Sequence, residues 1–278
     1  MIRYQSFVHF IRGARQPTVY IIGGIVLVIW LLLTPTGILG KADAIGYAVC
    51  HRIDARSFHI GVRQLPLCAR CTGQYLGAVT GLIFLGVFGK RRSGFPPKGI
   101  MGVSILLIII YAVDGLNSYL SLPQFIKYFP NMPHLYPPLN VLRLFTGTGM
   151  GLVIAIVLYP AFWSSVLTNP DIRPAIQDLR TLLVLISLGI LVDMLVLTGA
   201  EYVLYPVAFI ATGGVQLILG MAYTVLWIRL LHKENQFTRL SQIIPMVIGG
   251  FMISMVQLAL FDLIRFIITG TWDGLILG

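Results

Sequence analysis

The three cysteines of the chain, Cys50, Cys68 and Cys71, all fall in one short stretch between two apolar runs. Two of the five histidines, His51 and His59, lie in the same stretch. Thiols and imidazoles that gather in this way indicate metal binding or redox chemistry more often than packing. Because an apolar run follows at once, we expect this chemistry at the mouth of a membrane helix.

The pair Cys68-Ala-Arg-Cys71, followed by Thr72 and Gly73, has the spacing of a metal-binding knuckle. Two thiolates separated by two residues can hold one ion, and a nearby glycine lets backbone N–H groups approach the sulfurs. The predicted ligands are Cys50, His51, Cys68 and Cys71, with His59 as the alternative imidazole. Zinc suits this donor set, and an iron–sulfur centre is the less favoured alternative. A c-type haem is not predicted, because Thr72 stands where the haem signature needs histidine.

Redox chemistry is the rival interpretation of the same stretch. A C-x-x-C pair at a helix N-terminus has its thiol pKa lowered by the helix dipole and, here, by Arg70. Such a pair would exchange disulfides, with Cys50 as a third participant, and pass electrons to a quinone in the membrane. A structural disulfide, Cys68–Cys71 or Cys50–Cys71, is the third interpretation.

The composition is that of a membrane protein: 57% of the residues are hydrophobic and only 11% are charged. A helix that spans the bilayer needs about 20 mostly apolar residues. About seven stretches meet this requirement, and they are continuously apolar rather than alternating, which disfavours β-strand spans. They cover residues 18–39, 72–89, 99–122, 139–163, 181–200, 202–231 and 241–269. We therefore predict an all-α, polytopic bundle in which the fifth and sixth spans form a tight hairpin.

The chain divides by motif rather than by soluble domains. Residues 1–160 form the expected motif-bearing membrane domain, with the Cys/His loop at 41–71, and residues 161–278 add further helices of the same bundle. The first apolar run is long enough to span and lacks a small-residue cleavage site, so we expect it to be retained. The net charge of +10 arises from basic residues that flank spans, which favours anionic lipid headgroups and excludes nucleic acid as the expected partner.

Orientation follows from the same basic residues. On one side lie Arg3, Arg12, Arg15, Lys90, Arg91, Arg92, Lys98, Arg173, Arg180, Arg229, Lys233 and Arg239. This side carries roughly twice as many basic residues as the other, so the positive-inside rule makes it cytoplasmic. The Cys/His loop carries five basic residues of its own, which argues the other way. We predict a cytoplasmic N-terminus and an extracytoplasmic cysteine loop in a multi-pass protein of the cytoplasmic membrane.

Polar residues within the spans gather near the predicted outer side. Asp114 and Asn117 share one helix face, as do Asn140 and Arg143. Charged side chains inside spans are costly and usually face protein or water, so we predict a polar pocket under the cysteine loop. The candidate catalytic residues are Asp114, Asn117, Asn140 and Arg143.

Each candidate also has a structural interpretation. Asp114 acts as a base or ligand orienter and Arg143 holds an anionic group, or the two only neutralise each other between helices. Asp262 and Arg265 are expected to satisfy each other along their own helix. Close helix packing is expected at Gly147, Gly151, Gly213, Gly220, Gly249 and Gly250.

Two classes of function are consistent with these residues. In the first, zinc polarises a substrate or water, and the substrate is an amphipathic molecule such as a lipid headgroup or isoprenoid phosphate. In the second, the metal only fixes the loop, and the protein is a transporter or an accessory subunit of a membrane complex; its protein partner is then another subunit or a second copy of the chain.

The residues from Cys50 to Gly77 resemble the bacterial and archaeal membrane family DUF2085. The resemblance rests on Cys-His, Arg-Ser-Phe and Gln-Leu-Pro-Leu-Cys-Ala-Arg-Cys-Thr-Gly-x-Tyr-Leu-Gly, and extends more loosely to Asp114-Gly115 and to residues 140–147. This family has no established activity, so the resemblance implies a shared site and supplies no reaction. His59 and Arg63 depart from the family pattern, which leaves an altered ligand set open.

Overall fold

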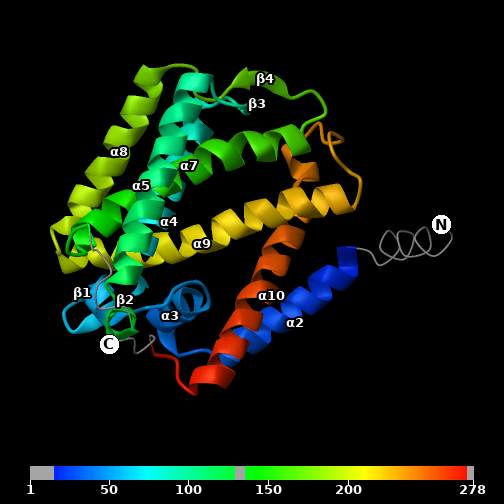
Figure 1. Cartoon of the computed structure of the whole chain (residues 1–278). Helices are drawn as coiled ribbons and strands as arrows, with labels where there is room; N and C mark the ends of the chain where they lie inside the picture. The colour runs from blue at the N-terminus through cyan, green and yellow to red at the C-terminus, as the bar shows by residue number, and fades with distance from the viewer. Residues whose placement is uncertain (1–15, 129–134, 274–278) are drawn as a thin grey trace.

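The computed structural model describes residues 16–128 and 135–273 of the chain, and α-helices dominate this part. The predicted all-α membrane bundle is confirmed. The helices are α2 (Gln16–Leu33), α3 (Gly37–Val49), α4 (Ala69–Phe88), α5 (Lys98–Leu120), α6 (Pro123–Tyr128), α7 (Asn140–Val166), α8 (Leu179–Leu197), α9 (Glu201–Leu230) and α10 (Ile244–Thr269) (Figure 1). The basic residues Arg3, Arg12 and Arg15, used above for orientation, lie outside the described residues.

Six of these helices are long and apolar enough to cross a membrane, and the bent pair α2–α3 brings the number to seven if it counts as one span. The prediction of an unbroken helix over 18–39 is wrong, because α2 ends at Leu33 and α3 leaves at an angle of 115°. Pro35 disfavours helical backbone at the preceding residue. Gly37 then adopts a φ of +80°, a left-handed conformation that glycine tolerates best.

Helices α4 and α7 pack so closely that glycines are required on both. Gly73 and Gly77 face the backbone of α7, and Gly147 and Gly151 face the backbone of α4. A Cβ at any of these four positions would collide with a carbonyl oxygen of the opposite helix. The close packing predicted at Gly147 and Gly151 is thus confirmed, whereas Gly213 faces open space. This contact places the first turn of α4, which carries the C-x-x-C pair, beside the first turns of α7.

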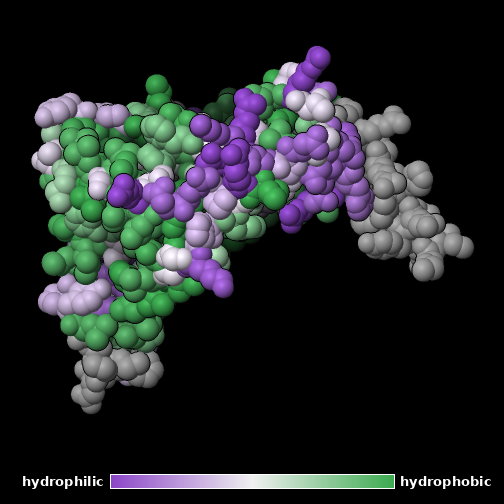
Figure 2. All heavy atoms as spheres, turned by 90° about the horizontal axis from the view of Figure 1, so that it is seen from above, coloured by the Kyte–Doolittle hydropathy of each residue, from purple (hydrophilic) through white to green (hydrophobic). Residues whose placement is uncertain are grey.

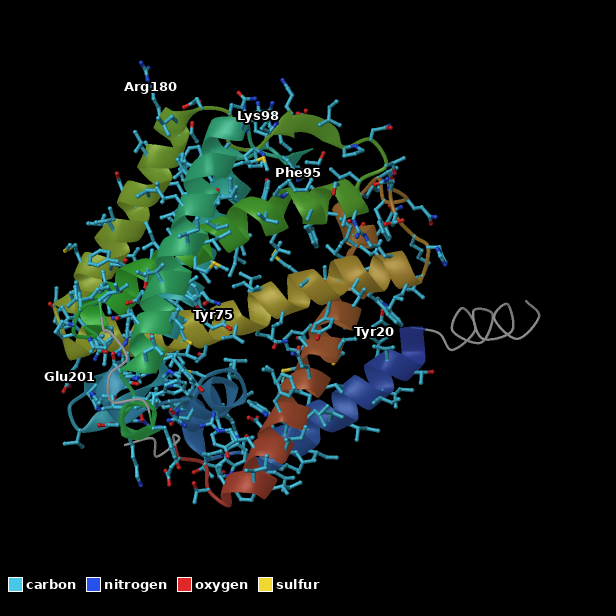
Figure 3. The ribbon with its side chains drawn as sticks, viewed as in Figure 1. Tyr20, Tyr75, Phe95, Lys98, Arg180 and Glu201 are labelled. Carbon is cyan, nitrogen blue, oxygen red and sulfur yellow. The ribbon has the colours of Figure 1, made fainter. Side chains whose placement is uncertain are left out.

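Short strands close the two ends of the bundle. At one end, β1 (Ser57–Ile60) and β2 (Arg63–Cys68) form an antiparallel hairpin, preceded by the 3-10 turn η1 (Asp54–Arg56). At the other end, β3 (Arg92–Gly94) pairs in parallel with β4 (Asp171–Pro174), and η2 (Leu240–Gln242) precedes α10. We call the end with β1 and β2 the cysteine end, and the end with β3 and β4 the strand-pair end. In Figure 3, Lys98 and Arg180 lie at the strand-pair end, opposite Glu201 at the start of α9.

The short link predicted between the fifth and sixth spans is present between α8 and α9, but the two helices diverge from it (Figure 1) and do not pack along each other as the predicted tight hairpin. Gly199 makes this turn with a φ of +68°. Helices α5 and α8 leave most of their apolar side chains exposed, which fits a surface that faces lipid. Seen from above, hydrophilic residues form a band across the molecule and hydrophobic residues cover most of the surface on one side of it (Figure 2).

Candidate metal centre

The three cysteines come together at the cysteine end from three different local structures. Cys50 follows the last turn of α3, Cys68 ends β2, and Cys71 lies in the first turn of α4. Their sulfur atoms all lie within 4.8 Å of one another, with Cys50 and Cys68 buried and Cys71 partly buried. The predicted convergence of the cysteines is therefore confirmed.

Backbone contacts hold Cys50 beside Cys68. A Cβ at Gly46 would collide with the carbonyl oxygen of Pro66, so only glycine lets α3 approach β2 this closely. The backbone N–H of Cys68 then donates to the Sγ of Cys50 over 3.4 Å. Amide donation of this kind orients a sulfur ligand and stabilises negative charge on it.

The pKa values of Cys50 and Cys68 are shifted in opposite directions. The hydrogen bond between Cys50 and Cys68 raises the pKa of Cys50, because its thiol is the donor, and burial raises it further. The same bond holds the pKa of Cys68 well below its usual range, with help from Cys71 and from His51. Cys68 is therefore the thiol of the two whose ionisation is favoured, and the thiolate is the form that ligates metals and attacks disulfides.

Neither histidine belongs to the group of mutually close ligand atoms among the described residues. The Nδ1 of His51 accepts the backbone N–H of Ile53 over 3.1 Å, and its side chain also hydrogen-bonds Cys68. His59 lies on the hairpin, where its Nε2 is 2.8 Å from the Oδ1 of Asp54. His51 is thus the imidazole next to the thiols, and its role as fourth ligand stays a prediction.

Arg265, near the end of α10, holds the backbone of the cysteine stretch. Its guanidinium donates to the carbonyl oxygens of Tyr47 at 2.6 Å, Cys50 at 2.5 Å and His51 at 3.2 Å, and lies 4.0 Å from the Tyr47 ring centroid. The expected pairing of Asp262 with Arg265 along the helix is wrong, because Asp262 instead accepts the indole N–H of Trp30 over 2.7 Å. Sequence reasoning missed this role of Arg265, since its partners are carbonyl groups more than 200 positions away.

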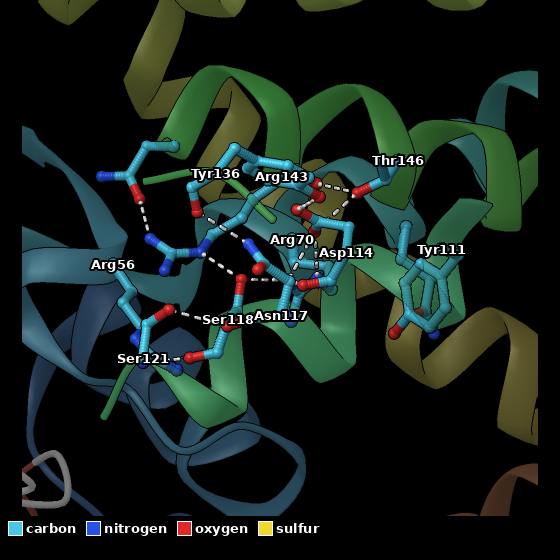
Figure 4. A network of polar contacts seen from close by, with 12 residues as sticks. Arg56, Arg70, Tyr111, Asp114, Asn117, Ser118, Ser121, Tyr136, Arg143 and Thr146 are labelled. Atoms are coloured by element: carbon cyan, nitrogen blue, oxygen red, sulfur yellow. Dashed lines mark hydrogen bonds and ion pairs between the residues drawn. The ribbon is translucent and has the colours of Figure 1, made fainter. Parts of the chain in front are cut away.

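Beside the cysteines, Asp114 of α5 is the centre of a polar network (Figure 4). Its carboxylate is 1% exposed and accepts hydrogen bonds from Arg70, from the hydroxyl of Tyr136 at 3.0 Å and from that of Thr146 at 3.1 Å. The alternative in which Asp114 and Arg143 neutralise each other as an ion pair is wrong. The partner of Asp114 is Arg70, which lies between the two cysteines of the C-x-x-C pair.

Arg143 belongs to the same network without touching Asp114. Its Nε lies 3.4 Å from the Oγ of Ser118, and its Nη1 donates to the Oδ1 of Asn140 over 2.7 Å. Arg70 donates to the same Ser118 hydroxyl over 2.8 Å. Ser118 therefore links the two arginines, and sequence reasoning did not single it out because an isolated serine near a helix end carries no chemical signal.

The two asparagines have positioning contacts. Asn117 donates to the carbonyl of Tyr136 and accepts the backbone N–H of Leu135, both at 2.9 Å, which holds the start of the segment that leads into α7. Asn140 orients Arg143 and also donates to the carbonyl of Ala55, at 3.2 Å. Asp114, Asn117, Asn140 and Arg143 thus belong to one network, and their catalytic roles stay predictions.

The part of the chain that carries most of these residues is similar to a known family. Residues 50–157 match the family model described as "Predicted membrane protein (DUF2085)". The resemblance to DUF2085 is confirmed. The matched part, which we call the DUF2085 segment, contains the three cysteines, Asp114 and Arg143, whereas Arg265 lies outside it.

Two archaeal relatives each match a part of the chain. An uncharacterised protein of Methanocaldococcus jannaschii is 29% identical over 120 residues, which are 42% of this chain and 66% of that protein, just under two thirds of its length. An uncharacterised protein of Methanothermobacter thermautotrophicus is 29% identical over 109 residues, which are 39% of this chain and 83% of that protein. No solved structure matches the chain.

Proposed function

We propose that this membrane protein binds a zinc ion through Cys50, Cys68 and Cys71 and uses the site to bind an anionic, lipid-like small molecule. The observation that carries the proposal is the gathering of three sulfur atoms within 4.8 Å of one another. A tetrahedral zinc ion with bonds of about 2.3 Å holds its sulfur ligands a little under ~4 Å apart. Sulfur separations of no more than 4.8 Å are compatible with this geometry.

The chemistry of the donor set supports zinc as the resident metal. Soft thiolate donors in a tetrahedral arrangement suit zinc, and the backbone N–H of Cys68 is already directed at the Cys50 sulfur. His51 is the proposed fourth ligand, because its ring lies beside Cys68. If His51 instead stays with the Ile53 amide, the fourth position is open to water or substrate, as in catalytic zinc sites.

The neighbouring network has the parts of a binding site. Zinc would supply Lewis-acid polarisation of a bound group or water. In this proposal Arg143, held by Ser118 and Asn140, binds the anionic group of the substrate. Asp114 holds Arg70, and its oxygens already accept several donors, which supports a positioning role over general-base catalysis.

A thiol–disulfide protein that exchanges electrons with a quinone is the second candidate function. The observation that favours it is the same closeness of the sulfurs. Two of the cysteines can form a disulfide, and the thiolate of the third can then attack one of its sulfur atoms. In that case oxidation forms one disulfide by loss of two protons and two electrons, which the quinone accepts as it becomes a quinol. The two functions predict different thiol counts in the isolated protein.

Metal analysis with a parallel thiol count tests the proposal. We expect about one zinc ion per chain in full-length protein purified in mild detergent, with three thiols that react after chelation. Cys50→Ser, Cys68→Ser and Cys71→Ser should each lose most of the metal. His59→Gln is the matched control and should keep it, because this imidazole is bound to Asp54. Metal-free protein with one disulfide and one thiol would overturn the zinc centre in favour of the redox function.

A further inference from the structure

Three guanidinium groups converge on Ser118. Arg70 and Arg143 donate to its hydroxyl oxygen, and the Nη2 of Arg56 donates to its carbonyl oxygen over 2.8 Å. They arrive from α4, α7 and η1 respectively, so the convergence is produced by the tertiary fold. Arg56 is 9% exposed and Arg143 is 5% exposed, which places both charges in the interior.

The positive charge of this cluster is only partly compensated. Asp114 neutralises Arg70, and among the described residues no carboxylate pairs with Arg56 or Arg143. A zinc ion held by three thiolates adds one net negative charge nearby, which still leaves one guanidinium uncompensated. Burial and the charge of Arg70 lower the pKa of Arg56, as expected for like charges held together. A buried charge without a partner is strongly unfavourable, so a negatively charged ligand would be stabilised at this cluster.

Hydrogen-bond donors remain for such a ligand. Arg143 uses Nε and Nη1, and its Nη2 has no hydrogen-bond partner among the residues that the structure describes. Arg56 uses Nη2 alone, within the same described part of the chain. Guanidinium groups with free N–H donors match the oxygens of a phosphoryl or carboxylate group.

The position of the cluster in the fold favours a phosphoryl group over a carboxylate as its ligand. Ser118 lies in the last turn of α5 and Arg143 in the first turn of α7, at the ends of two candidate spans. The ends of spans lie at the depth of lipid headgroups, where phosphoryl groups are the abundant anions. We propose that Arg56 and Arg143 form a binding site for a phosphoryl group, from a phosphate-monoester headgroup or from free phosphate. This inference deepens the anionic-substrate part of the proposed function and rests on it.

Binding of two phosphoryl sources to full-length protein tests the site. Inorganic phosphate is titrated into protein in a maltoside detergent, which carries no phosphate, and calorimetry measures the affinity. Phosphatidic acid is compared with diacylglycerol, the same lipid without its phosphoryl group, by native mass spectrometry. We expect saturable phosphate binding, or retention of phosphatidic acid but not diacylglycerol; the first result identifies free phosphate and the second a headgroup. Binding of neither ligand overturns the site.

Variants locate the binding to the two arginines. Arg56→Gln and Arg143→Gln should weaken binding by about tenfold or more, because each loses charge-assisted hydrogen bonds. Arg173→Gln is the matched control, since it removes an exposed arginine at the strand-pair end, and it should bind as the wild type does. If both cluster variants bind with wild-type affinity, the assignment to Arg56 and Arg143 is overturned.

Zinc content, measured on each sample, separates this inference from the proposed function. Variants that keep their zinc report on the anion site in a folded cysteine end. If a glutamine variant loses its zinc, the corresponding lysine variant, which keeps the charge but not the guanidinium, replaces it. We expect the lysine variant to bind more weakly than the wild type; wild-type binding by the lysine variants would overturn the assignment. Phosphoryl binding without zinc would refute the metal centre alone, whereas zinc without phosphoryl binding would refute the anion site alone.

Discussion

The two ends of the bundle carry charged residues in opposite ways. At the cysteine end, buried side chains connect segments that are far apart in the sequence, as Arg70 does with Asp114 and Arg265 with the carbonyl of Cys50. At the strand-pair end, the closest ion pairs are local and exposed, Arg173 with Asp171 at 2.7 Å and Arg229 with Glu234 at 3.1 Å. The longer contact of Arg92 with Asp171, at 3.8 Å, joins distant segments. The buried contacts hold distant segments in place around the candidate site, whereas the exposed ion pairs join residues of the connecting segments.

The physical cost of the two arrangements differs. Exposed ion pairs contribute about 0–1 kcal/mol to the free energy of unfolding. The exposed charges at the strand-pair end are therefore ordinary surface charges that indicate no site. Buried ion pairs often fail to recover their desolvation cost, and removal of one partner is strongly destabilising. The concentration of buried charge around Ser118 and the cysteines therefore marks the end of the molecule where function is expected.

The largest contrast is topological, since the two ends should face opposite sides of the membrane. Val62 at the tip of the β1–β2 hairpin and Arg173 in β4 are both exposed. We predict that an impermeant maleimide labels Val62→Cys in intact cells, above the level of the wild-type thiols, and labels Arg173→Cys only after permeabilisation. The reverse pattern would place the cysteine end in the cytosol and weaken the redox function, because cytosolic thiols are kept reduced.

Loss of the central carboxylate should have the largest effect on stability. Asp114→Asn leaves Arg70 buried without its counter-charge, so we expect the free energy of unfolding to fall by about 3–5 kcal/mol. Arg229→Gln breaks a surface pair and should change it by no more than about 1 kcal/mol. Unfolding in mixed SDS and maltoside micelles measures both. Equal effects of the two substitutions would remove the energetic distinction between the ends.

Arg265→Gln should have an intermediate effect. The substitution removes charge-assisted hydrogen bonds to carbonyl groups, so we expect a loss of about 1.5–3 kcal/mol. We also expect faster transfer of zinc to a chelator with an unchanged zinc stoichiometry, because Arg265 positions Cys50 without ligating metal. Arg180→Gln at the strand-pair end is the control. Chelator kinetics identical to wild type would show that α10 does not position the metal site.

The smallest effect is expected at Asp171, where hydrogen bonds from Arg173 lower the carboxyl pKa to about 2. A depressed pKa stabilises the fold above the ordinary value of about 3.9, and this contribution disappears as the pH falls through about 2. Asp171→Asn should therefore lower the melting temperature slightly at pH 7 and leave it unchanged near pH 2. Melting curves over this range measure it, and a difference that grows with acidity would contradict the assigned sign.

The sequence was sufficient to predict features that depend on local spacing. The three cysteines lie within 50–71, so the chain between them is short enough to bring them together, and their convergence is confirmed. Small residues four apart, such as Gly147 and Gly151, indicate close helix contact in any membrane bundle. The short link before Glu201 permits little except a tight turn.

Features that depend on helix neighbours could not be predicted. Asp114 pairs with Arg70 rather than Arg143, and this choice is set by how α4, α5 and α7 rotate against one another. Arg265 binds backbone carbonyls, which leave no trace in side-chain patterns. The break at Pro35 was missed because residues 18–39, taken together across Pro35, are long and apolar enough to be one span.

Zinc K-edge X-ray absorption of the purified wild-type protein tests the central claim most directly. We predict a first shell of three sulfur atoms at about 2.3 Å and one nitrogen or oxygen atom at about 2.0–2.1 Å. An imidazole scattering pattern that disappears in His51→Ala would identify the fourth ligand. A shell made only of nitrogen and oxygen atoms would show that any zinc present is bound elsewhere, and would contradict the three-cysteine centre.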